Sequence, residues 1–163
     1  MILQTKRLII RKFKPTDLAS LIDMFADPEV MRYIGPRRAL TEDEAKKWLK
    51  DILLQQDRVL TRYAVALLET DELIGVAGLD DEEGIKDFGY YFRRRFWGKG
   101  YAIEACAAIL NHIENILNIQ DYQIFIADEN INSIRLIQRL GLQAGEGITR
   151  SSEHGHLYQR VPG

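Results

Sequence analysis

The sequence has a single cysteine among its 163 residues, no long apolar segment and almost no net charge. One cysteine, Cys106, cannot form an internal disulfide, which favours a reducing compartment. No stretch approaches the roughly 18 apolar residues that a membrane-spanning helix needs. Residues 1–12 also lack the apolar core of a signal peptide. We therefore expect a cytoplasmic protein that has no membrane partner.

The charge and the histidines exclude two further classes of function. A net charge of −2 argues against a nucleic-acid partner, because such proteins normally present a basic surface. The three histidines and the cysteine do not fall at the spacings of metal ligands. His154 and His156 form the one histidine cluster, and histidines spaced in this way are more often polar strand residues. We expect no metal.

The hydrophobic pattern predicts one α/β domain (an α+β arrangement) spanning residues 1–163, with a mixed sheet of about seven strands. Strands are expected at 8–13, 62–68, 73–79, 87–93 and 122–127, with two more within 143–161. Helices are expected after Thr16 as a cap, after a capping box at 41–44, after Gly100 and after Asn130. The helix between 87–93 and 122–127 predicts that these two strands are parallel.

Two glycines, Gly98 and Gly100, flank Lys99 between an expected strand and an expected helix. The first turn of a helix has unpaired N–H groups and a partial positive charge, and glycine lets a phosphate approach the backbone closely. The run Arg93–Arg95 adds positive charge nearby. The segment therefore predicts a pyrophosphate site, although a plain turn explains the glycines equally well at this point. The Rossmann and Walker patterns do not fit, because Ile103 stands at the sixth position from Gly98 and Gly100 follows Lys99.

The segment from Trp97 to Ala102 resembles the signature Gln/Arg-x-x-Gly-x-Gly/Ala of the GNAT superfamily of N-acetyltransferases, with Trp97 where Gln or Arg is usual. The run from Arg95 to Gly100 also satisfies the bare pattern. Phe-Trp-Gly-Lys-Gly-Tyr-Ala at 96–102, followed by Glu104, looks like the RimJ/RimL-type branch, the ribosomal-protein N-terminal acetyltransferases. Four further segments are similar to that branch: 3–11 with Asp17, 75–78, 87–90, and Asn130-x-x-Ser133 with 139–142.

This resemblance implies a strongly twisted sheet with helices on both faces and two central parallel strands that splay apart. It also implies that acetyl-CoA is the donor substrate and that its pantetheine arm pairs with main-chain groups in the splay. The cofactor-binding residues that it implies are Phe92, Arg93 and Arg94 for the arm, Trp97, Gly98, Lys99, Gly100, Tyr101 and Ala102 for the pyrophosphate, and Asn130 for the arm.

Acetyl transfer to an amine needs a group that takes a proton from the amine, and the departing thiolate then needs a proton or leaves as an anion. Asp87 matches an acidic position that serves as the base in some relatives, although an aspartate that ends a turn explains it nearly as well. Glu82 and Glu83 in the same turn are weaker candidates. For the acid, many relatives carry a tyrosine where this chain has Ile137. Ser133 is the candidate replacement, and its alternative role is to cap the helix.

The substrate pocket is expected to include Tyr33. Trp48, His154, His156 and Tyr158 could also line it, although core packing is the better explanation of Trp48 and Tyr158. Cys106 lies on an apolar helix stripe, which argues against an acetyl-enzyme.

The expected reaction is transfer of the acetyl group to a primary amine, either a protein N-terminal α-amine or a small-molecule amine, by direct attack in a ternary complex. The expected state is a monomer or homodimer. A catalytically silent acetyl-CoA-binding domain with a role in sensing or assembly is the alternative.

Overall fold

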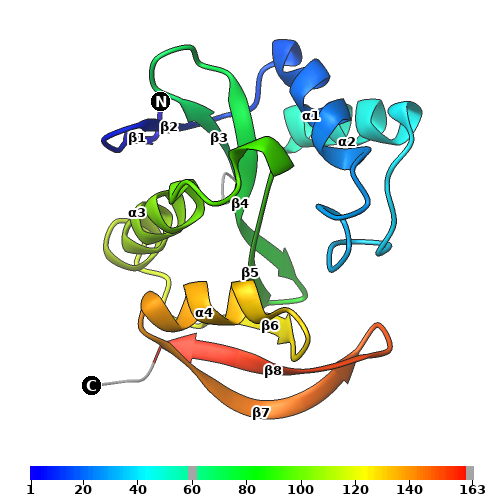
Figure 1. The fold of residues 1–163 in the computed structure, drawn as a ribbon. Helices are drawn as coiled ribbons and strands as arrows, with labels where there is room; N and C mark the ends of the chain where they lie inside the picture. The colour runs from blue at the N-terminus through cyan, green and yellow to red at the C-terminus, as the bar shows by residue number, and fades with distance from the viewer. Residues whose placement is uncertain (59–61, 161–163) are drawn as a thin grey trace.

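The computed structural model describes residues 1–58 and 62–160, which form one mixed sheet with helices on both faces (Figure 1). The strands are β1 (Leu3–Gln4), β2 (Leu8–Arg11), β3 (Arg62–Leu67), β4 (Leu73–Glu82), β5 (Ile85–Phe92), β6 (Tyr122–Ala127), β7 (Leu142–Arg150) and β8 (Glu153–Arg160). The helices are α1 (Leu18–Phe25), α2 (Glu42–Gln55), α3 (Tyr101–Asn115) and α4 (Ile131–Arg139). The order across the sheet is β1-β2-β3-β4-β5-β6-β8-β7.

The α/β architecture predicted from the sequence is confirmed, with eight described strands instead of about seven. The additional strand is β1, which pairs antiparallel with β2 through Leu3–Ile10 and Gln4–Ile9. One core cluster joins the sheet to α3 and to Ile137 of α4, and a second joins it to α1 and α2. Figure 1 accordingly shows α1 and α2 on one side of the central strands and α3 on the other.

Two local expectations are corrected. Thr16 is not a helix cap, because residues 15–17 form a 3₁₀ turn (η1, Pro15–Asp17) before α1, and the Asp17 carboxylate accepts the Lys14 N–H at 2.8 Å. The polar segment 80–84 is mostly strand, since β4 and β5 pair from Gly75–Phe92 out to Glu82–Ile85. The remaining turn has positive φ at Glu83 (54°) and Gly84 (82°), as a two-residue hairpin with this twist requires.

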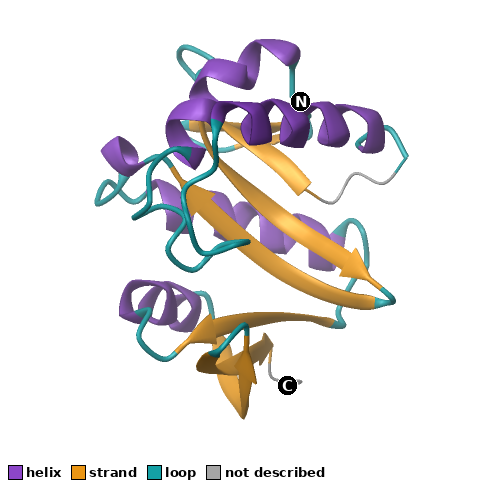
Figure 2. Ribbon diagram, turned by 90° about the vertical axis from the view of Figure 1, so that its right-hand side faces the viewer, coloured by secondary structure: helices purple, strands orange, loops and turns teal. Residues whose placement is uncertain are grey.

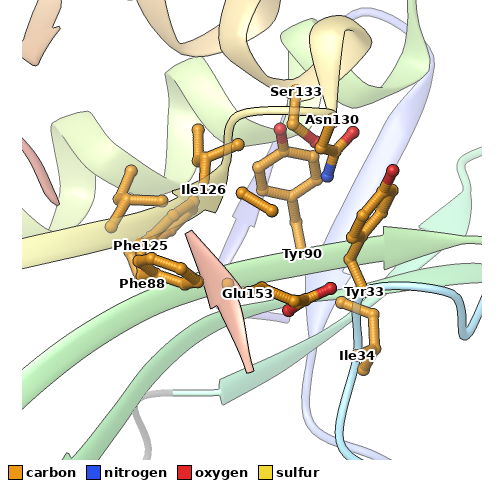
Figure 3. Close-up of a pocket in the computed structure, with 12 residues that line it drawn as sticks. Tyr33, Ile34, Phe88, Tyr90, Phe125, Ile126, Asn130, Ser133 and Glu153 are labelled. Atoms are coloured by element: carbon orange, nitrogen blue, oxygen red, sulfur yellow. The ribbon is translucent and has the colours of Figure 1, made fainter. Parts of the chain in front are cut away.

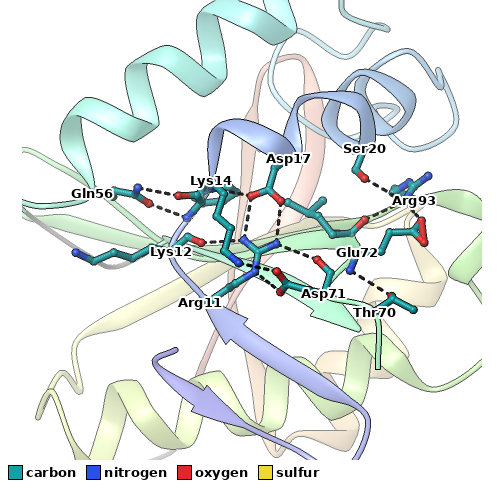
Figure 4. Close-up of polar contacts among 12 residues, drawn as sticks. Arg11, Lys12, Lys14, Asp17, Ser20, Gln56, Thr70, Asp71, Glu72 and Arg93 are labelled. Atoms are coloured by element: carbon teal, nitrogen blue, oxygen red, sulfur yellow. Dashed lines mark hydrogen bonds and ion pairs between the residues drawn. The ribbon is translucent and has the colours of Figure 1, made fainter. Parts of the chain in front are cut away.

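A buried ion pair connects β2 to the start of α1 (Figure 4). Arg11 and Asp17 form two parallel hydrogen bonds of 2.8 and 3.0 Å, and each side chain is only 5% exposed. Arg11 also donates to the Asp71 carboxylate at 2.8 Å, which ties in the turn between β3 and β4. Its guanidinium therefore fixes three segments at once, and the fork geometry of arginine suits this task.

The parallel strands β5 and β6 pair only where they begin, at Lys86–Tyr122 and Asp87–Gln123. From Ile124 to Ala127, β6 pairs on its other side with β8. The sheet is therefore split beyond residue 87, and Figure 2 shows β6, β8 and β7 turned away from the larger part of the sheet. The predicted splay is confirmed. It places the ends of β5 and β6 on two sides of a site.

The split leaves main-chain groups of β5 without a strand partner on the β6 side. Arg93 donates its N–H to Ile74 of β4 at 2.8 Å. In an antiparallel pair, alternate residues direct their N–H and C=O groups away from that partner, so those of Tyr90 and Phe92 face β6. An extended ligand could bond to this edge as a strand does. In the described ranges, no helix has the length and apolar composition that crossing a membrane requires.

Candidate functional site

A cavity of about 70 Å³ lies where β5 and β6 separate (Figure 3). The two strands form its walls and α4 begins at its edge. The α1–α2 connection and the start of β8 close it from the other side. The residues that line it are Tyr33, Ile34, Phe88, Gly89, Tyr90, Ile124, Phe125, Ile126, Ala127, Asn130, Ser133 and Glu153. The site thus combines segments that are more than 100 residues apart in the chain.

Three polar side chains that meet in the cavity were expected at the site: Tyr33, Asn130 and Ser133. Asn130 is the N-cap of α4, yet its side chain makes no capping hydrogen bond, so its amide can bond to a ligand. Ser133 lies inside the first turn of that helix. The alternative role of Ser133 as the helix cap is therefore wrong, because Asn130 holds that position.

The glycine loop forms a second part of the site, at the start of α3. Gly98 has φ of 73° and Gly100, the N-cap of α3, has φ of 80°. These left-handed conformations favour glycine. A side chain at Gly98 would meet no atom of the protein within 4 Å, so the backbone there is open to an approaching ligand. The N–H groups of the first turn, at Tyr101 and Ala102, are those that a helix cannot pair internally.

The turn between β1 and β2 clamps this helix start. Glu104 accepts hydrogen bonds from the Thr5 hydroxyl at 2.6 Å and from the Arg7 side chain at 2.7 Å. Arg7 also donates to the Lys99 carbonyl at 3.0 Å and stacks 4.2 Å from the centre of the Tyr101 ring. Burial alone would raise the pKa of Glu104, but these bonds outweigh burial and lower the pKa. The clamp holds the glycine loop in place.

The arginine run beside the loop is paired with carboxylates of other elements. Arg93 is buried and bonds to Asp23 at 2.9 Å and to Glu72 at 2.7 Å. Arg94 pairs with Asp27, and Arg95 lies 3.2 Å from Glu72. The positive charge expected from these three residues beside the loop is therefore shared with carboxylates of the protein. These ion pairs fix the loop to α1 and to the β3–β4 turn.

Lys99 is different, since no carboxylate of the described residues lies within ion-pairing distance of it. Its ammonium group sits 5.9 Å from the centre of the Phe96 ring. Lys99 is thus the positive charge in the loop that stays available to an anion.

Some of the main-chain groups expected to bind the pantetheine arm have partners within the protein. The Arg93 N–H bonds to Ile74, and the Arg93 carbonyl accepts the Phe96 N–H at 3.0 Å. The Phe92 carbonyl accepts the Trp97 indole N–H at 2.8 Å. A ligand that used the Arg93 N–H would have to replace an existing bond, whereas either carbonyl could accept a second one. Among Phe92 and Arg93, only the Phe92 N–H points toward the split without such a partner in the described chain.

The structure separates the candidate bases. Asp87 accepts hydrogen bonds from Gln123 at 3.1 Å and Arg150 at 3.4 Å, at the last paired position of β5 and β6. It does not line the cavity but borders a second, open hollow together with Glu83, Ile85 and Arg150. Glu153 is the carboxylate that lines the cavity itself.

Glu153 and Tyr90 also line the cavity, and neither was predicted from the sequence as a site residue. Glu153 stands at the start of a strand that was expected only as part of a tail, and Tyr90 was noted only within a motif. No local pattern marks either residue, because each reaches the cavity through the packing of distant segments.

The other candidates lie away from the cavity. Trp48 packs edge-on against Phe13 and Phe25, with ring centres 5.3 and 5.1 Å apart, and Tyr158 is only 4% exposed. Core packing is thus confirmed for both aromatic residues. His154 and His156 instead lie 3.6 and 2.8 Å from Asp128.

The structure also bears on covalent catalysis by Cys106 and on metal binding. Burial raises the pKa of the Cys106 thiol, which keeps it protonated and unreactive. Over the described ranges, no three His, Cys, Asp or Glu side chains are placed to hold a metal ion.

Comparison with known proteins identifies the class. The Acetyltransferase (GNAT) domain family matches residues 7–143. An uncharacterized N-acetyltransferase, p20, of Bacillus licheniformis is 32% identical over 155 residues, which cover 93% of this chain and 86% of that protein. The chain therefore belongs to the GNAT family and is an acetyl-CoA-dependent acetyltransferase.

Solved structures share the fold. An acetyltransferase (GNAT family) from Bacillus anthracis superposes with a TM-score of 0.81 at 23% identity, covering 96% of this chain and 94% of that one. The ribosomal L7/L12 alpha-N-protein acetyltransferase RimL, in complex with coenzyme A, superposes with a TM-score of 0.79 at 15% identity, covering 98% and 97%. At these identities the likeness concerns the fold alone.

Proposed function

We propose that the protein transfers the acetyl group of acetyl-CoA to a primary amine by direct attack within a ternary complex. The observation that carries the proposal is the split between β5 and β6, which opens a cavity beside an unpaired strand edge. The glycine loop at the start of α3 adds an anion site. A long donor with a pyrophosphate at one end and a thioester at the other fits this combination.

The cofactor residues follow from this placement. Gly98, Gly100 and the first N–H groups of α3 would bind the pyrophosphate, with Lys99 supplying charge. Trp97 holds the loop through its bond to the Phe92 carbonyl. The arm would run along the β5 edge to Asn130, and the thioester would enter the cavity. A main-chain N–H on that edge would stabilise the oxyanion that forms when the amine attacks.

Glu153 is the better candidate for the base, because its carboxylate lies in the cavity where the amine must meet the thioester. Asp87 remains a candidate through a water chain from the neighbouring hollow. Replacing each residue by its amide separates them. Glu153→Gln is expected to lower kcat about 100-fold, and Asp87→Asn less than about 10-fold.

We further propose an α-amine of a protein N-terminus as the acceptor class. The resemblance of several sequence segments to the RimJ/RimL-type branch supports this choice. The alternative is a silent acetyl-CoA-binding domain. It is favoured by one observation: Ile137, where many relatives carry a tyrosine, is fully buried in the core.

The decisive experiment measures thiol release from acetyl-CoA with a panel of N-terminal peptides and small amines. Acetylation of one or more peptides supports the proposal. Thermal stabilisation by acetyl-CoA without turnover on any amine would leave the silent domain. No stabilisation at millimolar acetyl-CoA would contradict both.

A matched pair of glycine variants tests the cofactor site. Gly98→Ala and Gly84→Ala both place a side chain at positive φ (73° and 82°) with no atom of the protein within 4 Å. Both variants should therefore lose a similar, small amount of stability. Gly98→Ala alone is expected to weaken acetyl-CoA binding. If both variants bind acetyl-CoA with the same affinity, the pyrophosphate does not bind at Gly98.

A further inference from the structure

This inference rests on the proposed function. In that reaction, no residue has yet been assigned to stabilise the sulfur of the leaving group. As the amine nitrogen bonds to the carbonyl carbon, the C–S bond breaks and its electron pair moves to sulfur. The nitrogen gives its proton to the base. A hydrogen-bond donor beside the sulfur would stabilise the charge that develops there. The described residues that line the cavity include three hydroxyl groups, on Tyr33, Tyr90 and Ser133.

Tyr90 is distinguished from the other two by an unmet hydrogen bond. Its hydroxyl oxygen is buried and has no hydrogen-bond partner in the described chain. Buried polar groups are almost always paired, so an exception calls for an explanation such as a catalytic role or a missing partner. The neighbouring Ser133 hydroxyl is close enough to offset part of the pKa change that burial causes, but it does not complete a hydrogen bond.

The position of Tyr90 directs this hydroxyl to the place where the sulfur is expected. The residue lies on β5 beyond the last pair with β6, and its ring rises toward Ser133 and Asn130 (Figure 3). Asn130 has an uncommitted amide at the start of α4. The end of the pantetheine arm would pass between these groups. Ile137, farther along α4, faces the core and has no hydroxyl to offer.

We propose that Tyr90 is a catalytic residue, whose hydroxyl donates a hydrogen bond to the sulfur of acetyl-CoA while the C–S bond breaks. Ser133 lies beside this hydroxyl without bonding to it. Burial raises the pKa of Tyr90 well above its ordinary value of 10.0. The phenol therefore keeps its proton beside the departing thiolate, because even an ordinary phenol, with a pKa of about 10, is a weaker acid than an ordinary cysteine thiol, with a pKa of about 8.5. Tyr90 stabilises the thiolate, and the thiolate takes its proton from solvent after it leaves.

The test compares Tyr90→Phe with Tyr91→Phe. The two tyrosines are adjacent, but Tyr91 packs on the opposite face of β5, with its ring centre 5.9 Å from that of Phe25. Tyr90→Phe is expected to lower the single-turnover rate of acetyl transfer about 100-fold, as loss of one donor to a developing charge does. Tyr91→Phe should change this rate less than about twofold.

Two further measurements distinguish catalysis from structure. The dissociation constant of acetyl-CoA should change less than about threefold in Tyr90→Phe. Its Tm without ligand should stay the same or rise by about 2–4 °C, because the variant removes a buried hydroxyl that has no partner. Ser133→Ala should lower the rate less than Tyr90→Phe, since Ser133 does not bond to the Tyr90 hydroxyl.

The outcomes separate this inference from the proposed function. If the wild type acetylates no amine, the proposed function fails. If the wild type is active and Tyr90→Phe keeps its full rate, the role of Tyr90 is refuted. A slower Tyr90→Phe that also loses acetyl-CoA binding or several degrees of Tm would show a structural role and refute it equally.

Discussion

Arg37 in the α1–α2 connection and Glu153 on β8 form an ion pair of 2.9 Å, although 116 residues separate them in the chain. Arg37 is held with a positive φ of 58° and donates to the Gly35 carbonyl at 2.7 Å. The pair joins the connection to β8 beside the cavity that Glu153 lines. The guanidinium therefore bonds to one oxygen, Oε1, of the carboxylate that a cationic acceptor would approach.

From this relationship we predict the effect of Arg37→Ala on acceptor binding. Removal of the guanidinium frees Glu153 for the ammonium form of the acceptor. The KM of the amine should fall about two- to fivefold, the range that a partly exposed ion pair of about 0.5–1 kcal/mol allows. Arg38→Ala is the control, since Arg38 pairs with Glu44 at 2.8 Å. A higher KM in Arg37→Ala would mean that Arg37 binds the acceptor itself.

Two glycines of the split sheet predict opposite phenotypes. A methyl group at Gly155 would lie 2.3 Å from the Ile126 carbonyl oxygen, whereas one at Gly89 would meet nothing within 4 Å. Gly155→Ala should lower the free energy of unfolding by about 2 kcal/mol or more, because β6 and β8 must move apart. Gly89→Ala should change it by less than about 1 kcal/mol and yet slow acetyl transfer, since Gly89 lines the cavity. Urea unfolding and thiol release measure the two effects. An inactive, unstable Gly89→Ala would contradict the distinction.

The clamp on α3 predicts a pH-dependent stability. The folded state lowers the pKa of Glu104 below its ordinary 4.5, so the unfolded chain binds the proton more readily. The clamp therefore stabilises the protein above about pH 4.5, and this contribution is lost as the pH falls through the folded pKa. At pH 7, Glu104→Gln should reduce the free energy of unfolding by about 1–2 kcal/mol.

The difference between wild type and Glu104→Gln should shrink as the pH is lowered below 4.5. Glu146→Gln serves as the control, because Glu146 is exposed on β7. Denaturant unfolding from pH 3 to 7 measures both variants. A difference that stays constant with pH would show that ionisation of Glu104 does not carry the effect.

The buried pair of Arg11 and Asp17 predicts a large, non-additive loss. Asp17→Ala leaves a guanidinium that is 5% exposed with Asp71 as its remaining carboxylate. The expected loss is about 3 kcal/mol, toward the low end for broken buried pairs because Asp71 remains. The double variant Arg11→Met, Asp17→Leu should lose less than the sum of its single changes. Additive losses in a denaturant-unfolding cycle would show that the two residues act independently.

Much of the architecture could be predicted from local patterns. The helix after Thr41 begins with the expected capping box, in which Thr41 and Glu44 bond reciprocally. The parallel pairing of β5 and β6 follows from the helix between them. Thr16 was wrongly predicted as a helix cap, because the Asp17 carboxylate fixes the start of α1. The segment 80–84 was wrongly predicted as a turn, because the pairing of β4 with β5 extends to Glu82 and Ile85. The side-chain carboxylate and the strand pairing outweigh the local preference of a threonine or of a polar run.

The amino-acid sequence by itself determined the order of the elements, the glycine loop at the start of α3 and the family, since each depends on residues close together in the chain. Only the tertiary structure decided which groups share the cavity. It brought Glu153 there and left Asp87 at the paired end of β5, gave Arg93, Arg94 and Arg95 carboxylate partners, and left the Tyr90 hydroxyl without one. The physical reason is that these outcomes depend on where the split sheet places distant segments. Neither periodicity nor spacing encodes that arrangement.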